Sequence, residues 1–418
     1  MKYQTVSAKA DTFSNWIAVA LGFSIPISTA LDNIFLGLFL VLWMLGAGYR
    51  EKWQSIKGNP VALLSIALFA LLTAGLLYGD RNPGDGLLYL GKYKELLLIA
   101  FLIPCFQDER IRRRGLNAFT LALVLTLFFS YAIGMGLLPE YFFFAGRTTS
   151  GIPVLLNPVT FKLSITHNIL MAFAAFLFAM RSRHELEVGA RVAWAVLSLL
   201  AIFNVLFMVQ GRTGYFILAL LLLYFFYDTF NWKGLALAAM LGTLLFAGAY
   251  LGSNTFHSRI TKAASEFSQW HPDKTAAVDS SVGLRLEWYK NSLEIVREHP
   301  LFGVGTGGFL KAYADKVKGT GMLVPGNPHN EYLLIAVQVG LAGLALLLYL
   351  FYRQWRLAAA LPTALERNLA HGLLLAIMSG CLFNSLLVDH TEGLLYGWMS
   401  GLLYAGLKSN LKNNGPTT

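Results

Sequence analysis

The sequence NPHNE at residues 327–331 holds the side chain best suited to proton transfer. An apolar run begins here, so we expect Asn327 to cap a helix and Pro328 to occupy its first position. His329 then falls in the first helical turn, where the positive helix end disfavours imidazolium and keeps the ring neutral. A neutral imidazole can accept a proton, as a general base must. The alternative is an interfacial histidine that only caps the loop.

Two arginines have settings suited to an anion. Arg212 follows Gly211 and opens an apolar run, where free backbone N–H groups and a guanidinium together would bind negative charge. Arg285 lies one turn into a predicted helix that starts near Ser281. The alternatives are an arginine that reaches to lipid headgroups, for Arg212, and a solvated surface charge, for Arg285.

Lys94 is a further candidate because it lies inside an apolar run. Its neighbours Lys92 and Glu95 are three residues apart and can pair on one helix face. That pairing leaves Lys94 without an evident local partner, and such a charge is a candidate for holding an anionic group. Arg147, in a predicted outer loop, is a further candidate for holding an anionic group.

Three polar residues are supporting candidates. Asn330 follows the candidate base directly. Asp389 begins the sequence DHTE and either orients His329 or the substrate or belongs to an ordinary polar hairpin. His167 lies in an apolar run, where a buried polar group needs a partner whatever it does.

Other chemistries have little support in the sequence. Outside the apolar runs we find no paired-carboxylate site, no H-E-x-x-H and no nucleophile elbow, so we expect neither a metal nor a cofactor. Residues 303–308 match the G-x-G-x-x-G spacing, but they follow a helix and a proline instead of a strand. We interpret them as a glycine-rich turn that brings the backbone close to a membrane helix or a substrate. Cys105 and Cys381 lie in apolar runs and are predicted to be core thiols.

Composition places these residues in a bilayer protein. Of 418 residues, 56% are hydrophobic and 13% charged, and the mean hydropathy is +0.55. A soluble domain of this composition would have to expose apolar surface that it could not bury. We predict an all-α membrane protein with about twelve transmembrane helices, each long enough to cross ~30 Å of hydrocarbon. Their expected ranges are 13–30, 33–49, 60–78, 86–105, 115–138, 163–180, 191–208, 213–228, 234–252, 329–351, 368–387 and 393–407.

Charge asymmetry predicts the topology. The net charge is +10, yet the basic residues do not share one face as a nucleic-acid site requires, so we expect no nucleic-acid partner. Lys and Arg gather between alternate runs, which predicts cytoplasmic termini. The sequence shows no repeat and no separate soluble domain, so we expect one membrane domain over 1–418. Residues 252–328, between the ninth and tenth spans, then form a long outer loop with a helix near 284–296. No small-residue cleavage site follows the first run, so we expect no cleavable signal peptide.

Four short motifs follow one another between residues 210 and 343. They are GRTG at 211–214, Ser281 to Arg285 with Trp288, HPLFGVG at 299–305, and His329-Asn330 followed by Gly340 and Gly343. In this order they resemble the bacterial O-antigen ligase/polymerase superfamily of membrane glycosyltransferases, and the ligase branch in particular. Phe216 stands where that branch often has leucine, and because both are apolar we interpret the change as tolerated.

The resemblance implies a glycosyltransferase C-type fold and a donor polysaccharide linked through diphosphate to undecaprenol. For a ligase of lipopolysaccharide synthesis it implies an acceptor hydroxyl on lipid A core oligosaccharide. Transfer would be inverting and metal-independent, at the periplasmic face of the inner membrane. His329 would then be the base while Arg212 and Arg285 hold the departing diphosphate, helped by Lys94 and Arg147.

Two alternatives stay open. A polymerase or protein O-oligosaccharyltransferase of the same superfamily would share the donor chemistry and differ in its acceptor, although the compact length favours the ligase. A transporter or flippase of an anionic lipid would use the same basic residues to bind cargo. Such folds often contain inverted repeats and broken helices, and the sequence indicates neither.

Overall fold

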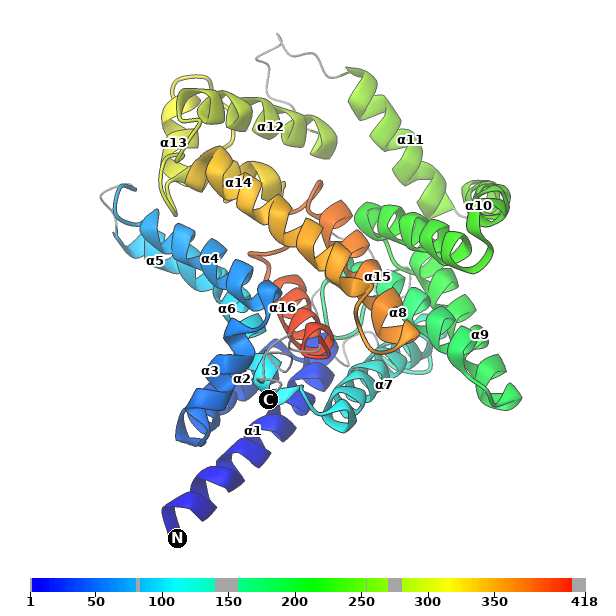
Figure 1. Cartoon of the computed structure of the whole chain (residues 1–418). Helices are drawn as coiled ribbons and strands as arrows, with labels where there is room; N and C mark the ends of the chain where they lie inside the picture. Colours follow the sequence, from blue (N-terminus) through cyan, green and yellow to red (C-terminus); the bar gives the residue numbers. More distant parts are fainter. Residues whose placement is uncertain (1, 80–82, 140–156, 253, 270–279, 408–418) are drawn as a thin grey trace.

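The computed structural model describes residues 2–79, 83–139, 157–252, 254–269 and 280–407, and within these ranges every regular element is a helix (Figure 1). In chain order the helices are α1 (Lys2–Ile27), α2 (Thr29–Leu45), α3 (Tyr49–Lys57), α4 (Pro60–Ala74), α5 (Pro83–Lys92), α6 (Lys94–Cys105), α7 (Glu109–Gly134), α8 (Ser164–His184), α9 (Val188–Phe203) with a π-helical turn at Asn204–Met208, α10 (Arg212–Gly252), α11 (Asn254–Gln269), α12 (Ser281–Glu298), α13 (Phe309–Lys316), α14 (Glu331–Ala358), α15 (Ala364–Gly380) and α16 (His390–Tyr404).

Several of these helices are long and apolar enough to cross a bilayer, as a multi-pass membrane protein requires. Five described helices qualify, namely α7, α8, α9 with its π-helical turn, α10 and α14, and the bent pair α2 and α3 would make a sixth. All twelve predicted runs fall on described helices, but several of these helices are shorter than a full span or interrupted. The all-helical fold is thus confirmed, and twelve spans stay a prediction.

Helices are broken inside the predicted spans, contrary to what the sequence indicated. The backbone of α14 leaves the helical region at Val339 and Gly340, where Gly340 has a φ of +68°. The predicted fourth span is divided at Tyr93 into α5 and α6, whereas the kink of α10 at Asn231 falls between the predicted spans 213–228 and 234–252. A break leaves backbone groups without helical partners, so other segments must supply them.

The glycine-rich segment supplies those partners at the break in α14. Val304 N donates to Val337 O at 2.8 Å and Gly305 N donates to Gln338 O at 2.9 Å. A side chain here would clash, because a Cβ on Gly303 would lie 2.3 Å from Val337 O. The predicted close approach of this turn to a membrane helix is therefore confirmed.

The long loop carries the predicted helix. α12 begins after Ser280, whose Oγ accepts a hydrogen bond from Gly283 N at 3.0 Å, and it ends at Glu298, before Pro300. It packs along α14, with α11 beyond one end and α13 at the other (Figure 1). Cys105 and Cys381 are buried free thiols, as predicted.

Candidate active site

The ring of His329 is held against α12. Its imidazole stacks on the indole of Trp288, with centroids 5.1 Å apart and planes 25° from parallel. The neighbouring Tyr289 fixes the backbone on the same side, because its single O–H is shared between His329 O at 3.1 Å and Leu382 O at 2.9 Å. The half-buried His329 therefore occupies a defined position between α12 and the start of α14.

The predicted helix start at Asn327 is wrong. α14 begins at Glu331, and its cap is Asn330, whose Oδ1 accepts from Leu333 N at 3.0 Å. Asn327 instead closes a turn of its own, since its Oδ1 accepts from His329 N at 2.8 Å. His329 has a φ of +52°, which is left-handed, so the helix cannot include it. The base candidate thus lies two residues before α14.

The surroundings of His329 favour the neutral imidazole, and the cause is burial instead of the predicted helix end. Burial lowers the pKa of His329 to about 4, and the positive charge of Arg285 acts in the same direction. Burial likewise lowers the pKa of Arg285, and Arg212 acts in the same direction. Arg285 therefore lies near both His329 and Arg212, and at neutral pH the imidazole is able to accept a proton.

Three arginines from three helices line one cavity of about 270 Å³. They are Arg212 of α10, Arg259 of α11 and Arg285 of α12. Glu266 partly offsets this charge, since its Oε2 lies 3.9 Å from Arg212 Nη1. Guanidinium groups that share one small cavity repel each other, and an anion with two or more charges relieves that repulsion. Their planar forks suit the paired oxygens of a diphosphate.

The start of α10 is fixed by close packing on α8. A Cβ on Gly214 would lie 2.1 Å from Asn168 Oδ1, and one on Gly211 would lie 2.7 Å from Asn168 Cβ. Asn168 Nδ2 in turn donates to Val209 O at 2.8 Å. The glycines on either side of Arg212 therefore let the helix start seat on Asn168, which sets where the guanidinium enters the cavity.

Some candidates lie apart from this cavity. Lys94 does not line the arginine cavity. Its Nζ lies 3.5 Å from Glu95 Oε1, so Glu95 pairs with Lys94 and the predicted pairing of Glu95 with Lys92 is wrong. The break at Tyr93 separates Lys92 from Glu95, and Lys92 Nζ lies 4.8 Å from the Tyr89 ring centre instead.

Of the supporting candidates that the structure describes, one lies at the site and two lie away from the arginine cavity. Asn330 joins the site as the cap of α14, and its Nδ2 donates to Leu382 O at 3.1 Å. His167 is fully buried against Asn204, with Nε2 3.2 Å from Oδ1, and Asp389 precedes α16 without lining the arginine cavity. Arg147 lies outside the described residues.

Sequence reasoning missed Arg259. It lies on α11, and its Nε donates to Gln210 Oε1 at 3.0 Å, next to Arg212 in sequence. A basic residue on a predicted loop helix gives no signal of its own, because only the return of α11 toward the start of α10 brings it to the cavity.

The described fold and site define a class: a multi-pass helical membrane protein with a cationic cavity beside a neutral histidine. Residues 196–348 match a family described as O-antigen ligase, and this stretch contains all three arginines and His329. This stretch of the chain is therefore similar to the O-antigen ligase family. A search of curated proteins gave no match.

Proposed function

We propose that this protein is an O-antigen ligase that transfers polysaccharide from undecaprenyl diphosphate to a hydroxyl of lipid A core oligosaccharide. One observation carries the proposal: Arg285 belongs to the arginine cavity and also lowers the pKa of His329, so an anion site and a base adjoin. A glycosyl diphosphate needs both, one to hold the leaving group and one to activate the acceptor.

The reaction is a single displacement. The acceptor hydroxyl oxygen attacks the anomeric carbon and its proton moves to the free ring nitrogen of His329. The bond from the anomeric carbon to the diphosphate oxygen breaks, and that oxygen keeps the electron pair. Attack opposite the leaving group inverts the configuration of the anomeric carbon.

The arginines act on the departing group. Undecaprenyl diphosphate gains one negative charge as the sugar leaves, so Arg212, Arg259 and Arg285 bind it more strongly in the transition state than in the donor. Arginine charge thereby replaces the divalent ion that many transferases use. Within the described residues no group of three or more His, Cys, Asp or Glu side chains is arranged to hold a metal ion.

The orientation is part of the proposal. Twelve spans of glycosyltransferase C type would place both termini in the cytoplasm and residues 252–328 in the periplasm, at the inner membrane. Charge asymmetry along the chain supports this arrangement. Cysteines introduced at Ser265 and Lys316 should then react with an impermeant thiol reagent in intact spheroplasts, and labelling only after lysis would contradict it.

The test is transfer by purified protein in excess EDTA. Lipid-diphosphate polysaccharide is supplied with lipid A core as acceptor, or alone. Product on lipid A core supports the ligase, whereas longer lipid-linked chains formed without that acceptor identify a polymerase. No product in EDTA but product with added magnesium would contradict metal independence.

A further inference from the structure

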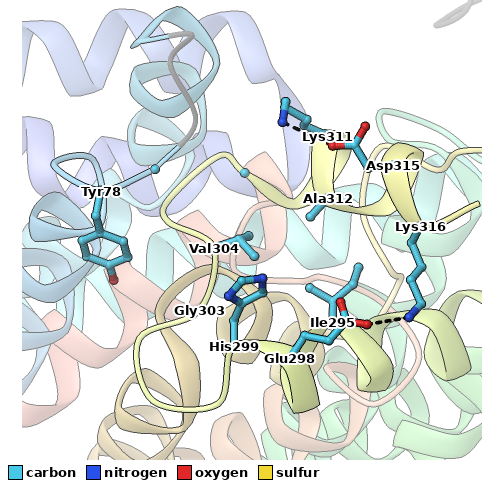
Figure 2. A pocket seen from close by; sticks show the side chains of 12 residues that line it. Tyr78, Ile295, Glu298, His299, Gly303, Val304, Lys311, Ala312, Asp315 and Lys316 are labelled. Atoms are coloured by element: carbon cyan, nitrogen blue, oxygen red, sulfur yellow. Dashed lines mark hydrogen bonds and ion pairs between the residues drawn. The ribbon is translucent and has the colours of Figure 1, made fainter. Parts of the chain in front are cut away.

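A second cavity, of about 590 Å³, lies at the other end of α12 (Figure 2). Its walls come from the last turn of α12, the HPLFGVG motif at 299–305, α13 and the segment after α4. Of that motif, His299, Gly303 and Val304 line the cavity. The transfer chemistry above leaves this motif without a role beyond its contact with α14.

The charges in this cavity are balanced, unlike those of the arginine cavity. Lys316 Nζ lies 2.7 Å from Glu298 Oε1, and Lys311 Nζ lies 3.2 Å from Asp315 Oδ2. Figure 2 shows Tyr78 on one side of the view and the two ion pairs on the other, with the His299 ring between Tyr78 and the Glu298–Lys316 pair. Cations already paired with carboxylates attract a phosphate weakly, so a diphosphate would prefer the arginines.

The lining suits a ligand rich in hydroxyl groups. Ammonium groups donate, carboxylates accept, and an imidazole can do either, which matches hydroxyls that do both. Ile295, Val304 and Ala312 add apolar surface for carbon-bound hydrogens. A volume within the range of about 300–1,000 Å³ that is usual for ligand sites accommodates such a molecule.

α12 sets the order of the two cavities. Arg285 lies near its start, Trp288 and its partner His329 follow one turn later, and Glu298 ends the helix. At 1.5 Å per residue, Glu298 is roughly 15 Å beyond Trp288 along the axis. The base therefore lies between the arginine cavity and the balanced cavity.

We propose that the balanced cavity binds an uncharged segment of the acceptor oligosaccharide, an inference that rests on the proposed transferase function. In a displacement the acceptor enters opposite the leaving diphosphate. The diphosphate occupies the arginine end of α12, so the acceptor chain extends past His329 toward the other end, where the cavity lies.

Filling the cavity tests this. In Ala312→Trp an indole replaces a methyl group that lines the cavity on half-exposed α13, so the helix itself should persist. The acceptor KM should rise roughly tenfold, as expected from losing one or two hydrogen bonds, while the donor KM stays unchanged. Leu293→Trp, at an exposed position of α12 outside the cavity, is the matched control and should leave both values unchanged.

Two outcomes would overturn the inference. An unchanged acceptor KM means that the cavity is empty during transfer, and a raised donor KM alone means that it holds the donor glycan. Core oligosaccharide and O-polysaccharide, each released from lipopolysaccharide of the source cells, should also be titrated directly onto wild type and Ala312→Trp. Only the core oligosaccharide should lose affinity. If wild type transfers nothing, the proposed function fails, and this titration still decides whether the cavity binds a glycan.

Discussion

The imidazole of His329 lies flat against the indole of Trp288, 5.1 Å from centroid to centroid. Because Tyr289 holds the carbonyl of His329 and Asn327 holds its N–H, ring and backbone are both fixed from neighbouring side chains. A base held in this way needs little reorganisation before it takes a proton.

The first prediction concerns this stacking. Trp288→Ala should lower kcat roughly tenfold with little change in donor KM, because an aromatic pair is worth about 0.5–1.5 kcal/mol and the freed ring samples other positions. Trp288→Phe keeps an aromatic face and should recover most of kcat. Steady-state kinetics of both variants decide the matter, and equal losses in the two would show that stacking does not position the base.

The second prediction is the pH dependence of transfer. Burial and Arg285 lower the pKa of His329 to about 4, and the neutral, active form exists above that pH. Transfer should therefore hold steady from neutral pH down to about 5 and fall below about 4, whereas an ordinary histidine would lose activity near 6.5. Arg285→Gln removes one cause, so the residual activity of that variant should fall at a higher pH. A wild-type loss near pH 6.5 would contradict this assignment.

The third prediction separates charge from shape in the arginine cavity. Lys at 212 or 285 keeps the charge but loses the bidentate fork, and transfer should fall about 10–100-fold. Ala should be worse at either site. Arg259→Ala should raise the donor KM less than Arg212→Ala or Arg285→Ala does, because the guanidinium of Arg259 is already hydrogen-bonded to Gln210. The control is Arg297→Ala, at an exposed position of α12 outside this cavity, which should leave transfer unchanged. Near-normal activity of Arg285→Ala would instead show that Arg285 is a solvated surface charge.

The fourth prediction addresses the break in α14. Gly340 has a φ of +68°, and a Cβ there would lie 2.1 Å from Leu301 O, so Gly340→Ala should destabilise the protein by at least about 1–3 kcal/mol. Gly326→Ala is the control, since nothing lies within 4 Å of its added Cβ. Thermal unfolding in detergent should show a lower midpoint for the first variant only. Equal midpoints would mean that the glycine-rich segment does not hold the break.

Hydropathy predicted where the helices lie but not where they break. After its polar start the run 329–351 is apolar from Leu333 to Phe351 except for Gln338, so its pattern is that of one continuous helix. Gly340 alone signals a break weakly, because a helix tolerates an isolated glycine. What breaks α14 is the pairing with residues 300–305, a long-range contact that local periodicity does not contain.

The candidate site shows the same division. Residue type and position near a helix end identified His329, Arg212 and Arg285, which the structure brings together. The prediction of Asn327 as the cap failed because an asparagine caps equally well at 330, and the left-handed backbone of His329 places the helix start after it.

The fifth prediction distinguishes a base from a residue that only holds the turn. His329→Ala keeps the Asn330 cap of α14, so the protein should fold and still bind the lipid-diphosphate donor. Transfer should nevertheless fall about 10²–10⁴-fold, the usual contribution of a positioned general base. His329→Gln can form hydrogen bonds and stack on Trp288, yet it takes up no proton at neutral pH, so it should be as inactive as Ala. Donor binding, measured by titration of each variant, serves as the folding control. A glutamine variant that transfers near the wild-type rate would remove His329 as the base and leave it only a part in the turn before α14.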